Sequence, residues 1–374
     1  MRRIRPTCVL VTGARGFIGK NLVVRLREQN GVEVLESHRG DSPTLLKELV
    51  AKCDSIIHLA GENRPNNVRD FERINTDFTR ILCEFILATG RAIPIIFASS
   101  TQAELDNPYG KSKLEAEKII KILATTSNVP CVVYRLPGVF GKWSKPNYNS
   151  VVATFCFNIA RDLDIKVDDP LTRLNLVYID TLVEDIIKTL SNIKAGFSLK
   201  TLSNTYSITL GELVDQILAF RESRTNLITE RVGEGLCRAL YSTYISFLPP
   251  NKFAYDLSQH SDDRGAFVEI VKTPDCGQFS FFSLHPGITR GSHYHHSKTE
   301  KFLVVKGLAR LRYRSLATNE KYEILVSGET PQVVDTIPGW VHDITNLGDG
   351  ELIVMLWANE VFNHDYPDTV TEEV

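Results

Sequence analysis

Three glycines near the beginning of the chain, Gly13, Gly16 and Gly19, constrain its fold more than any other feature. They follow an apolar run at residues 8–12 and precede a helical pattern, so the spacing GxxGxxG falls where a strand meets a helix. Glycines let the backbone approach a pyrophosphate closely, and the free N–H groups at the helix start bind its charge. Because this junction opens the first β-α unit, the sequence predicts a dinucleotide site and not only a tight turn.

The first 245 residues alternate short β-rich runs with longer amphipathic stretches. The strand-like runs are at residues 8–12, 55–59, 93–97 and 131–135. Helical spacing lies between them, for example at residues 71–87 and 111–123. This rhythm with buried parallel strands predicts a doubly wound α/β sheet. A further helix is expected over residues 229–245, before Pro249 and Pro250, which cannot continue it.

The pattern changes after residue 255. Strand-length runs such as 300–305 and 352–357 lie between Gly, Pro, Asn and Asp turns, without a long helical period. We therefore predict a domain at residues 1–245, a linker at 246–255 and a small all-β domain at 256–374. Seven of the nine histidines lie beyond residue 255, which indicates that this second domain has its own chemistry.

Composition narrows the functional classes. With 374 residues the chain should hold about two or three domains. Its net charge of −2 provides no general basic field for nucleic acid or an anionic membrane. We find neither a run approaching 18 apolar residues nor a secretory signal core. The seven cysteines contain no CxxC pair, which favours the reduced thiols of a cytoplasmic protein.

Arg39 follows the second expected strand, residues 33–36, at the place where NAD-binding folds usually carry an acidic residue for the ribose hydroxyls. A guanidinium suits a 2′-phosphate instead, and Arg15 in the glycine loop adds a second cation. The two arginines predict NADPH; the alternative is that both are solvated surface residues. His58 closes the third strand, and we expect it to be structural and not catalytic.

Tyr109 and Lys113 form a YxxxK pair on an expected helix, where residues i and i+4 share one face. Lys113 would lower the pKa of Tyr109 and hold the ribose, so that Tyr109 could exchange a proton with a substrate carbonyl or hydroxyl. Ser100, at the end of the fourth strand, is the first candidate to orient that carbonyl. We expect these three residues to be catalytic. The predicted cofactor contacts are Gly13, Arg15, Gly16, Phe17, Ile18, Gly19, His38, Arg39, Leu59, Ala60, Tyr109 and Lys113.

A second group of residues suits a metal. His293, His295 and Glu300 belong to the pattern G-x5-HxH-x4-E-x6-G, and His342 belongs to a later G-x2-H-x3-N. Residues i and i+2 of a strand face the same side, so three imidazoles and one carboxylate can converge on zinc or another first-row divalent ion. Both spacings match the two motifs of the cupin family. The alternative is a histidine cluster on a polar face, and His296 should point the other way.

Residues 1 to about 245 resemble an extended short-chain dehydrogenase/reductase that acts on nucleotide sugars. The resemblance is carried by the glycine loop and by the segments 107–113, 135–141 and 174–180. It implies a Rossmann-type parallel sheet. One departure is Gly138, where the family often has Asn.

The segments 262–269 and 287–294 resemble the nucleotide-deoxysugar epimerase branch of the cupins, which implies a jelly-roll domain. This resemblance implies that His293 is the base that removes a proton next to a ketone, and that Arg264 and Arg290 bind the substrate. Members of that branch need no metal, whereas this chain adds the metal-type residues named above. His293 is therefore expected to be a base, a ligand, or both.

The whole chain resembles the CapF/WbjC family of capsular polysaccharide synthesis enzymes, with specific similarity at residues 142–156, 240–244 and 355–360. The resemblance implies a bifunctional enzyme in the pathway to UDP-N-acetyl-L-fucosamine, for a capsule or an O-antigen. The cupin would epimerise C3 of a UDP-2-acetamido-2,6-dideoxy-4-hexulose. The reductase would then reduce the C4 ketone with NADPH, giving UDP-2-acetamido-2,6-dideoxy-L-talose.

Chemistry supports this order, because the C3 proton is acidic only while C4 is a ketone. Two other readings remain open: a reductase whose cupin and zinc are structural, and a non-catalytic sensor of NADPH or a nucleotide sugar. We expect a homodimer, because the Tyr109 helix often forms a dimer interface in related reductases and because cupins also pair. The expected partner is a UDP-linked 4-keto amino sugar, with no nucleic acid and no membrane.

Overall fold

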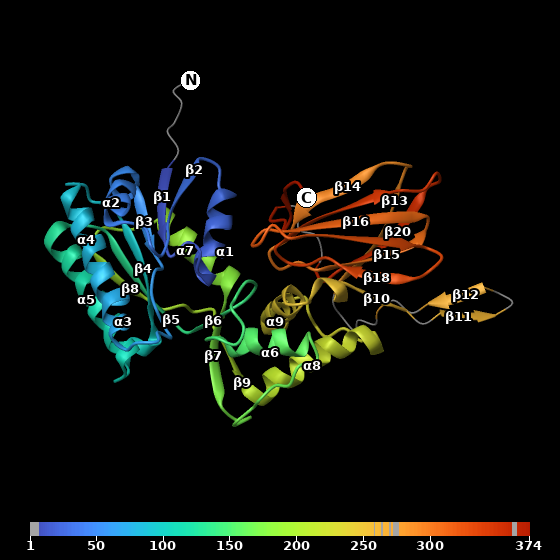
Figure 1. The fold of residues 1–374 in the computed structure, drawn as a ribbon, viewed down its shortest axis with the longest axis horizontal. Helices are drawn as coiled ribbons and strands as arrows, with labels where there is room; N and C mark the ends of the chain where they lie inside the picture. Colours follow the sequence, from blue (N-terminus) through green and yellow to red (C-terminus); the bar gives the residue numbers. More distant parts are fainter. Residues whose placement is uncertain (1–6, 258, 263–264, 269–270, 272–276, 361–364) are drawn as a thin grey trace, which may run out of the picture. The chain divides into compact units, whose positions relative to one another are not determined.

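The computed structural model describes residues 7–257, 259–262, 265–268, 271, 277–360 and 365–374 (Figure 1). The chain divides into two units, Met1–Val139 with Asn175–Ser207, and Phe140–Leu174 with Ile208–Val374. The second unit takes in residues on both sides of the linker predicted at 246–255. The proposed domain boundaries at residues 245 and 256 therefore stay a prediction.

The first unit is built on a six-stranded parallel sheet of order β2-β1-β3-β4-β5-β8. The strands are β1 (Thr7–Thr12), β2 (Val32–Ser37), β3 (Ser55–His58), β4 (Ile95–Ser100), β5 (Cys131–Leu136) and β8 (Phe197–Lys200). β3 and β4 are buried along their whole length. This is the predicted doubly wound sheet, and its order reverses at β1, so the carboxyl ends of β1 and β3 flank the switch point where such sheets bind ligands.

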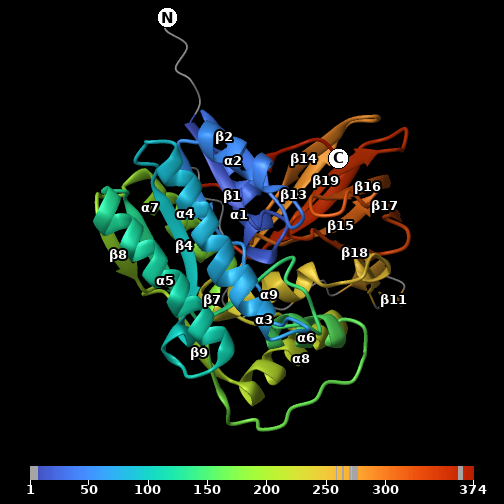
Figure 2. The ribbon, with the colours of Figure 1, turned by 60° about the vertical axis from the view of Figure 1, so that its left-hand side comes forward.

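Helices cover both faces of this sheet (Figure 1). They are α1 (Phe17–Arg27), α2 (Pro43–Lys52), α3 (Arg69–Phe71), α4 (Phe78–Ala88), α5 (Pro108–Ser127) and α7 (Ile179–Ser191). α1 packs against α7, whereas α2, α4 and α5 pack in a row on the other face (Figure 2). α5 begins where the side chain of Asn107 accepts a 2.8 Å hydrogen bond from Gly110 N, and it ends at Asn128 in the left-handed conformation.

The helical pattern at residues 71–87 is not one regular helix. A π-helical turn, Glu72–Asp77, separates α3 from α4, and a short 3₁₀ helix, Thr101–Glu104, follows β4. The extra residue of a π turn shifts the side chains that follow it, and such turns are frequent near functional sites. Here the turn carries Asn75 toward α5, where it bonds to Ser112.

The second unit contains the helices α6 (Val151–Ile159), α8 (Leu210–Asn226) and α9 (Gly235–Ser246) and a 3₁₀ turn, Pro250–Lys252. The helix predicted over residues 229–245 begins later, at Gly235. A capping box at Thr209 and Glu212 starts α8. Strands β6 (Gly138–Phe140), β7 (Arg173–Tyr178) and β9 (Tyr206–Thr209) form a small sheet of order β6-β7-β9.

After residue 253, all regular structure in the described part of the chain is β-strand. Two five-stranded antiparallel sheets have the orders β10-β18-β15-β20-β13 and β17-β16-β19-β14-β21, with a separate hairpin β11-β12. The strands are β10 (Ala254–Asp256), β11 (Gln259–Asp262), β12 (Gly265–Val268), β13 (Gln278–Leu284), β14 (Thr289–Tyr294), β15 (Glu300–Lys306), β16 (Leu308–Ser315), β17 (Lys321–Ser327), β18 (Gln332–Asp335), β19 (Trp340–Asn346), β20 (Leu352–Ala358) and β21 (Val370–Thr371). This is the predicted all-β region. None of the described helices combines the length and apolar character that a membrane span requires.

Candidate functional site

The glycine loop lies between β1 and α1, and its glycines are required by space. Gly13 has φ +69°, and a Cβ there would lie 2.7 Å from the Ala60 backbone nitrogen. A Cβ on Gly19 would lie 2.3 Å from the carbonyl oxygen of Gly13. Gly16 is the N-cap of α1. Because it has no side chain, it cannot accept a hydrogen bond from the N–H groups of the first helical turn. The loop therefore fits a phosphate at a helix N-terminus.

The parallel register brings the other predicted cofactor residues to the same edge of the sheet. Thr12, the last residue of β1, pairs with Ser37 on one side and with His58 on the other. The predicted residues Phe17, Ile18, His38, Arg39, Leu59 and Ala60 follow directly after these strand ends or begin α1, and Arg15 is exposed in the loop.

Arg39 carries an ion pair that the sequence did not indicate. Its guanidinium lies 2.7 Å from Oε2 of Glu62, whereas the side chain of Arg39 is 74% exposed. The other oxygen of Glu62 accepts hydrogen bonds from the backbone nitrogens of Asn63 and Arg64. A fixed carboxylate therefore lies beside the cation expected to meet a 2′-phosphate.

Ser100, Tyr109 and Lys113 come together as the sequence predicted. Ser100 ends β4, and its hydroxyl is hydrogen-bonded to Tyr109, which lies in the first turn of α5. Lys113, one turn further, is buried and donates a 2.9 Å hydrogen bond to the carbonyl oxygen of Ala98. The structure thus aligns a hydroxyl, a phenol and an ammonium group along the end of β4.

The electrostatics of this set differ from the expectation. Burial raises the pKa of Tyr109, and only the hydrogen bond with Ser100 lowers it. Burial lowers the pKa of Lys113 to about 8, although the nearby Glu117 raises it. Lys113 is not among the groups that shift the pKa of Tyr109; its ammonium donates to Ala98 and lies over the ring of Phe97.

Two polar residues of this site escaped the sequence analysis. Asn75 is buried, and its amide donates to the Ser112 hydroxyl and to the carbonyl oxygen of Glu62. Glu117 is also buried and accepts hydrogen bonds from Ser99 and Arg135. The only signal in the sequence is a polar residue inside an apolar helical pattern, which does not by itself identify a site.

His58 and Gly138 both have steric or packing roles. His58 is fully buried between the hydroxyls of Thr12 and Thr79, at 2.7 and 2.9 Å, and burial lowers its pKa to about 3. This agrees with the structural role expected for it.

A Cβ on Gly138 would lie 3.0 Å from the Leu176 side chain, so the Asn that the family often carries would have to displace that neighbour.

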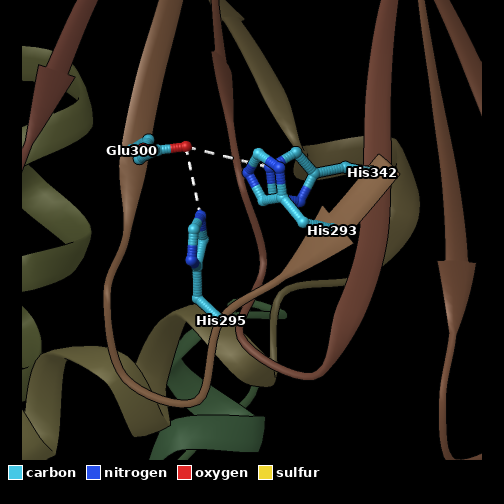
Figure 3. A group of neighbouring side chains, drawn as sticks. All are labelled: His293, His295, Glu300 and His342. Carbon is cyan, nitrogen blue, oxygen red and sulfur yellow. Dashed lines mark hydrogen bonds and ion pairs between the residues drawn. The ribbon is translucent and has the colours of Figure 1, made fainter. Parts of the chain in front are cut away.

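The four metal-type residues of the second unit converge (Figure 3). One potential ligand atom from each of His293, His295, Glu300 and His342 lies within 4.8 Å of the others. His293 on β14 pairs directly with His342 on β19, and Glu300 begins β15 of the other sheet. His295 follows the last residue of β14, and a register shift between Gly291 and His293 places His293 directly opposite His342.

The protonation states of His293, His342 and Glu300 suit a metal ion. Burial, followed by His342, lowers the pKa of His293 to about 3, and burial also lowers the pKa of His342. Burial alone would raise the pKa of Glu300, but the hydrogen bond with His295 and its other neighbours hold it well below the usual range. Neutral imidazoles and an ionised carboxylate are the forms that ligate metals.

Nε2 of His342 shows whether the cluster fits a metal ion. Nε2 of His342 is buried without a hydrogen-bond partner, and the nearest carboxylate oxygen, Oε2 of Glu300, is 3.8 Å away. A buried polar atom in this state is costly unless something binds it. Ligand atoms on a tetrahedral zinc ion lie about 3.4 Å apart, so a cluster whose atoms lie within 4.8 Å of one another would have to contract by about 1 Å to complete the site.

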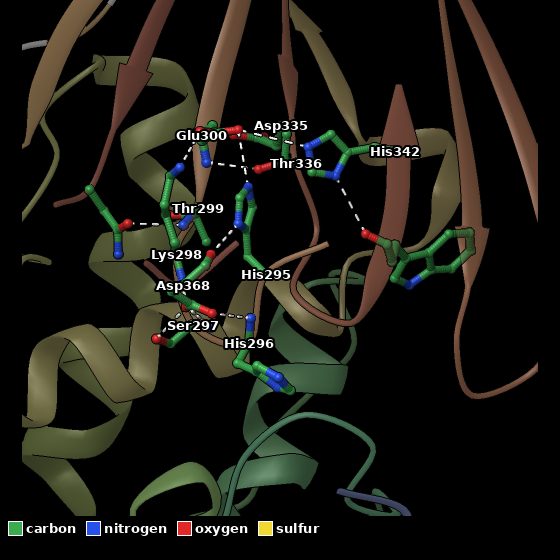
Figure 4. A network of polar contacts seen from close by, with 12 residues as sticks. His295, His296, Ser297, Lys298, Thr299, Glu300, Asp335, Thr336, His342 and Asp368 are labelled. Atoms are coloured by element: carbon green, nitrogen blue, oxygen red, sulfur yellow. Dashed lines mark hydrogen bonds and ion pairs between the residues drawn. The ribbon is translucent and has the colours of Figure 1, made fainter. Parts of the chain in front are cut away.

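Three predicted residues lie outside the two sets described above: Arg264, Arg290 and His296. Arg290 is exposed on β14, with its guanidinium over the ring of Phe282. Arg264 lies outside the described residues. His296 is buried and turned away from the cluster, as expected (Figure 4).

The sequence matches the NAD dependent epimerase/dehydratase family at residues 9–203 and the polysaccharide biosynthesis C-terminal domain at residues 260–370. A UDP-2-acetamido-2,6-beta-L-arabino-hexul-4-ose reductase of Pseudomonas aeruginosa is 52% identical over 361 residues, covering 96% of this chain and 97% of the relative. The crystal structure of the capsular polysaccharide assembling protein CapF from Staphylococcus aureus is 41% identical, with a TM-score of 0.67, covering 98% of this chain and 100% of that chain.

The fold and the two residue sets define a short-chain dehydrogenase/reductase joined to a cupin-type β domain. Among such proteins, the chain belongs to the CapF/WbjC family of capsular polysaccharide synthesis enzymes. The predicted family and fold class are both confirmed.

Proposed function

We propose that this chain is a bifunctional nucleotide-sugar enzyme of capsular polysaccharide or O-antigen synthesis. Its cupin part epimerises C3 of a UDP-2-acetamido-2,6-dideoxy-4-hexulose, and its reductase part reduces the C4 ketone with NADPH to UDP-2-acetamido-2,6-dideoxy-L-talose. The observation that carries the proposal is the presence of two chemically matched residue sets on one chain. The 52% identity to a hexulose reductase over nearly the whole chain supports the same substrate class.

The glycine loop would hold the pyrophosphate of NADPH, with Arg15 and Arg39 on the 2′-phosphate. The predicted contacts Phe17, Ile18, His38, Leu59 and Ala60 would line the rest of the cofactor. When bound, NADPH supplies the hydride for C4. The side chains of Arg39 and Glu62 lie 2.7 Å apart. To bind a phosphate, Arg39 must therefore either break this ion pair or contact Glu62 and the phosphate at the same time.

In the reductase part, Tyr109 gives its phenolic proton to the C4 oxygen, while Ser100 orients the carbonyl and Lys113 supports the phenol and the ribose. The raised pKa of Tyr109 keeps the phenol protonated at neutral pH. A protonated phenol is the form needed in the direction of reduction.

In the cupin part, His293, His295, Glu300 and His342 would hold zinc or another divalent ion, which would supply a Lewis acid for the ketone oxygen. His293 remains a candidate for both base and ligand. Its lowered pKa keeps the imidazole neutral at neutral pH, which is the form that a metal ligand or a general base needs. Arg264 and Arg290 are proposed to bind the charged substrate.

The order of the two steps follows from acidity. The C3 proton can be removed only while C4 is a ketone, because the resulting carbanion is then an enolate. Reduction removes the ketone and fixes the configuration at C3. We further propose that the enzyme is a cytoplasmic homodimer, as its nucleotide-sugar chemistry and the related reductases suggest.

The test is incubation of the purified protein with the UDP-4-keto sugar in D₂O, first without and then with NADPH, followed by NMR and mass spectrometry. Deuterium at C3 without NADPH, and a reduced product after NADPH is added, would support two sequential active sites. Reduction without C3 exchange would instead leave a ketoreductase with a structural cupin. Neither activity with any 4-keto sugar nucleotide would leave a non-catalytic sensor.

A further inference from the structure

The last residues of the chain return to the loop that carries the metal-type cluster. β21 pairs with β14, with Thr371 opposite His293 and Val370 opposite Tyr294. The backbone nitrogen of Glu372 also donates to the carbonyl oxygen of Ser292. The C-terminal segment therefore forms the edge of the sheet beside the cluster, although none of its residues belongs to the cluster.

Asp368, two residues before β21, holds the loop between His295 and Glu300 (Figure 4). Its Oδ1 accepts a 2.8 Å hydrogen bond from the backbone nitrogen of His296. Its Oδ2 accepts hydrogen bonds from the backbone nitrogens of Ser297 and Lys298, both at 2.7 Å, and from the Ser297 hydroxyl at 2.9 Å. An ionised Asp side chain has two acceptor oxygens and no donor, so it can accept hydrogen bonds from all four of these loop donors.

The main chain of the same residue fixes the ring of His295. The Asp368 carbonyl oxygen lies 2.5 Å from Nδ1 of His295, and a carbonyl can only accept, so Nδ1 carries the proton. Nε2 then faces the cluster and lies within hydrogen-bond distance of Oε2 of Glu300, at 3.3 Å, so that a bound ion would take the place of the proton between these two atoms. Metal-binding histidines commonly donate their other N–H to a carbonyl or carboxylate in this way, which sets the tautomer and the ring orientation.

We propose that Asp368 is a positioning residue for the cluster of His293, His295, Glu300 and His342. Its carboxylate sets the path of the loop, and its carbonyl presents Nε2 of His295 to a bound ion. This role rests on the metal site put forward under the proposed function. The C-terminal segment thus becomes part of that site through hydrogen bonds, without supplying a ligand.

The loop has a second support, which should keep a variant of Asp368 folded. Helix α9 contributes Arg238, which donates to the Ser297 hydroxyl, and Ser242, which donates to the Ser297 carbonyl oxygen. Asp368→Asn keeps the size of the side chain but turns one oxygen into an NH₂ group. That group must face at least one loop N–H, so the variant loses one to three hydrogen bonds and gains a clash between donors.

The experiment compares Zn²⁺ and Co²⁺ affinity, by titration of the metal-free protein, among wild type, Asp368→Asn and Glu373→Gln. Glu373 is an exposed residue of the same segment, so its variant makes the same change of charge without touching the loop. We expect Asp368→Asn to weaken metal binding about 10- to 100-fold and Glu373→Gln to leave it unchanged. Equal affinities in all three proteins would overturn the proposal.

A measurement on metal-free wild type completes the test and needs neither a metal nor a variant. Long-range ¹⁵N–¹H NMR of the His295 ring should show a protonated Nδ1. A neutral ring with the proton on Nε2 and a bare Nδ1 would overturn the proposal, even if Asp368→Asn did not fold. If wild type binds no metal, the proposed metal site fails separately, and the state of Nδ1 still decides the role of Asp368.

Discussion

The ammonium group of Lys113 donates a 2.9 Å hydrogen bond to the carbonyl oxygen of Ala98, just before the end of β4. This bond joins the helix that carries Tyr109 to the strand that carries Ser100. Lys113 is only 5% exposed, and burial lowers its pKa to about 8. The positive charge that would hold the cofactor ribose is therefore present at neutral pH and is lost in mildly alkaline solution.

We expect kcat/KM for ketone reduction to fall as the pH rises through about 8, because Lys113 loses its proton there, well below its ordinary value of 10.5. The measurement is the initial rate of NADPH oxidation from pH 6.5 to 9.5. Lys113→Met is the matched control, since it cannot titrate and should be slow without a step in this range. A wild-type profile without a decline up to pH 9.5 would contradict the prediction.

Tyr109→Phe should separate the two activities. The variant keeps the ring but has no proton to give, so NADPH oxidation should fall about 10²- to 10⁴-fold. Exchange of the C3 proton with D₂O should persist, because it depends on residues of the other part. Each assay serves as the control for the other, and parallel loss of both activities with an intact fold would show that this division of labour is wrong.

The ion pair between Arg39 and Glu62 gives a prediction about the cofactor. Arg39→Ala should raise KM for NADPH about tenfold or more while leaving KM for NADH nearly unchanged, because only NADPH has a 2′-phosphate. Glu62→Gln should lower KM for NADPH, because it frees the guanidinium now held at 2.7 Å.

The control for these variants is Arg27→Ala, which removes another exposed arginine paired with a carboxylate, Glu36. Its cofactor preference should match that of wild type. Equal effects of Arg39→Ala on both cofactors would mean that Arg39 is a surface residue without a role in the preference.

The sequence could predict those parts of the site that depend on local spacing. Each of three patterns is set within a few residues: the three glycines, the i and i+4 positions of Tyr109 and Lys113, and the strand-like run that begins at Glu300. The backbone of a single helix, turn or strand fixes the relative positions of the residues in such a local pattern. The parallel sheet and the all-β region were also predicted from local patterns, because the strands of the two regions differ in length, burial and flanking turn residues. The structure confirms both.

The rest depends on contacts between distant segments, which no local pattern encodes. Glu62 meets Arg39 across 23 positions, and Asp368 meets the His296 loop across about 72 positions. The position of His295 just beyond a strand, and the π-helical turn that carries Asn75, also result from packing. The sequence predicted the residue types of the cluster but could not predict what holds them in place.

His58 predicts how the first unit responds to acid. Its pKa of about 3 in the folded protein lies below the ordinary 6.5, so below pH 6.5 the unfolded chain binds the proton first. Stability should therefore fall as the pH decreases from about 6.5 toward 3, by up to about 5 kcal/mol from this residue. Urea unfolding at several pH values measures the slope.

His58→Gln should be less stable than wild type at pH 7.5, because it disturbs the bonds to Thr12 and Thr79, but it should lose less stability on acidification. His285→Gln changes an exposed histidine and is the control. Parallel stability curves for wild type and His58→Gln would show that His58 is not the group that titrates.

Asp335 holds two cations inside the second unit. Its Oδ1 lies 2.8 Å from the ammonium of Lys301 on β15, and its Oδ2 pairs with Arg224 from α8. Both Lys301 and Asp335 are buried. Although burial raises the pKa of Asp335, the two cations keep it below its ordinary value, so the carboxylate is charged at neutral pH.

Asp335→Asn should reduce the free energy of unfolding by about 3–5 kcal/mol, because it leaves the buried Lys301 and the largely covered Arg224 without their shared counterion. Glu323→Gln is the control: it removes one partner of an exposed pair with Arg310 and should cost less than about 1 kcal/mol. Urea unfolding at pH 7 measures both. In a Lys301→Met background the cost of Asp335→Asn should shrink, since only Arg224 then loses its partner. A cost that does not depend on Lys301 would show that the carboxylate acts through Arg224 alone, as the link between α8 and the β-sheet.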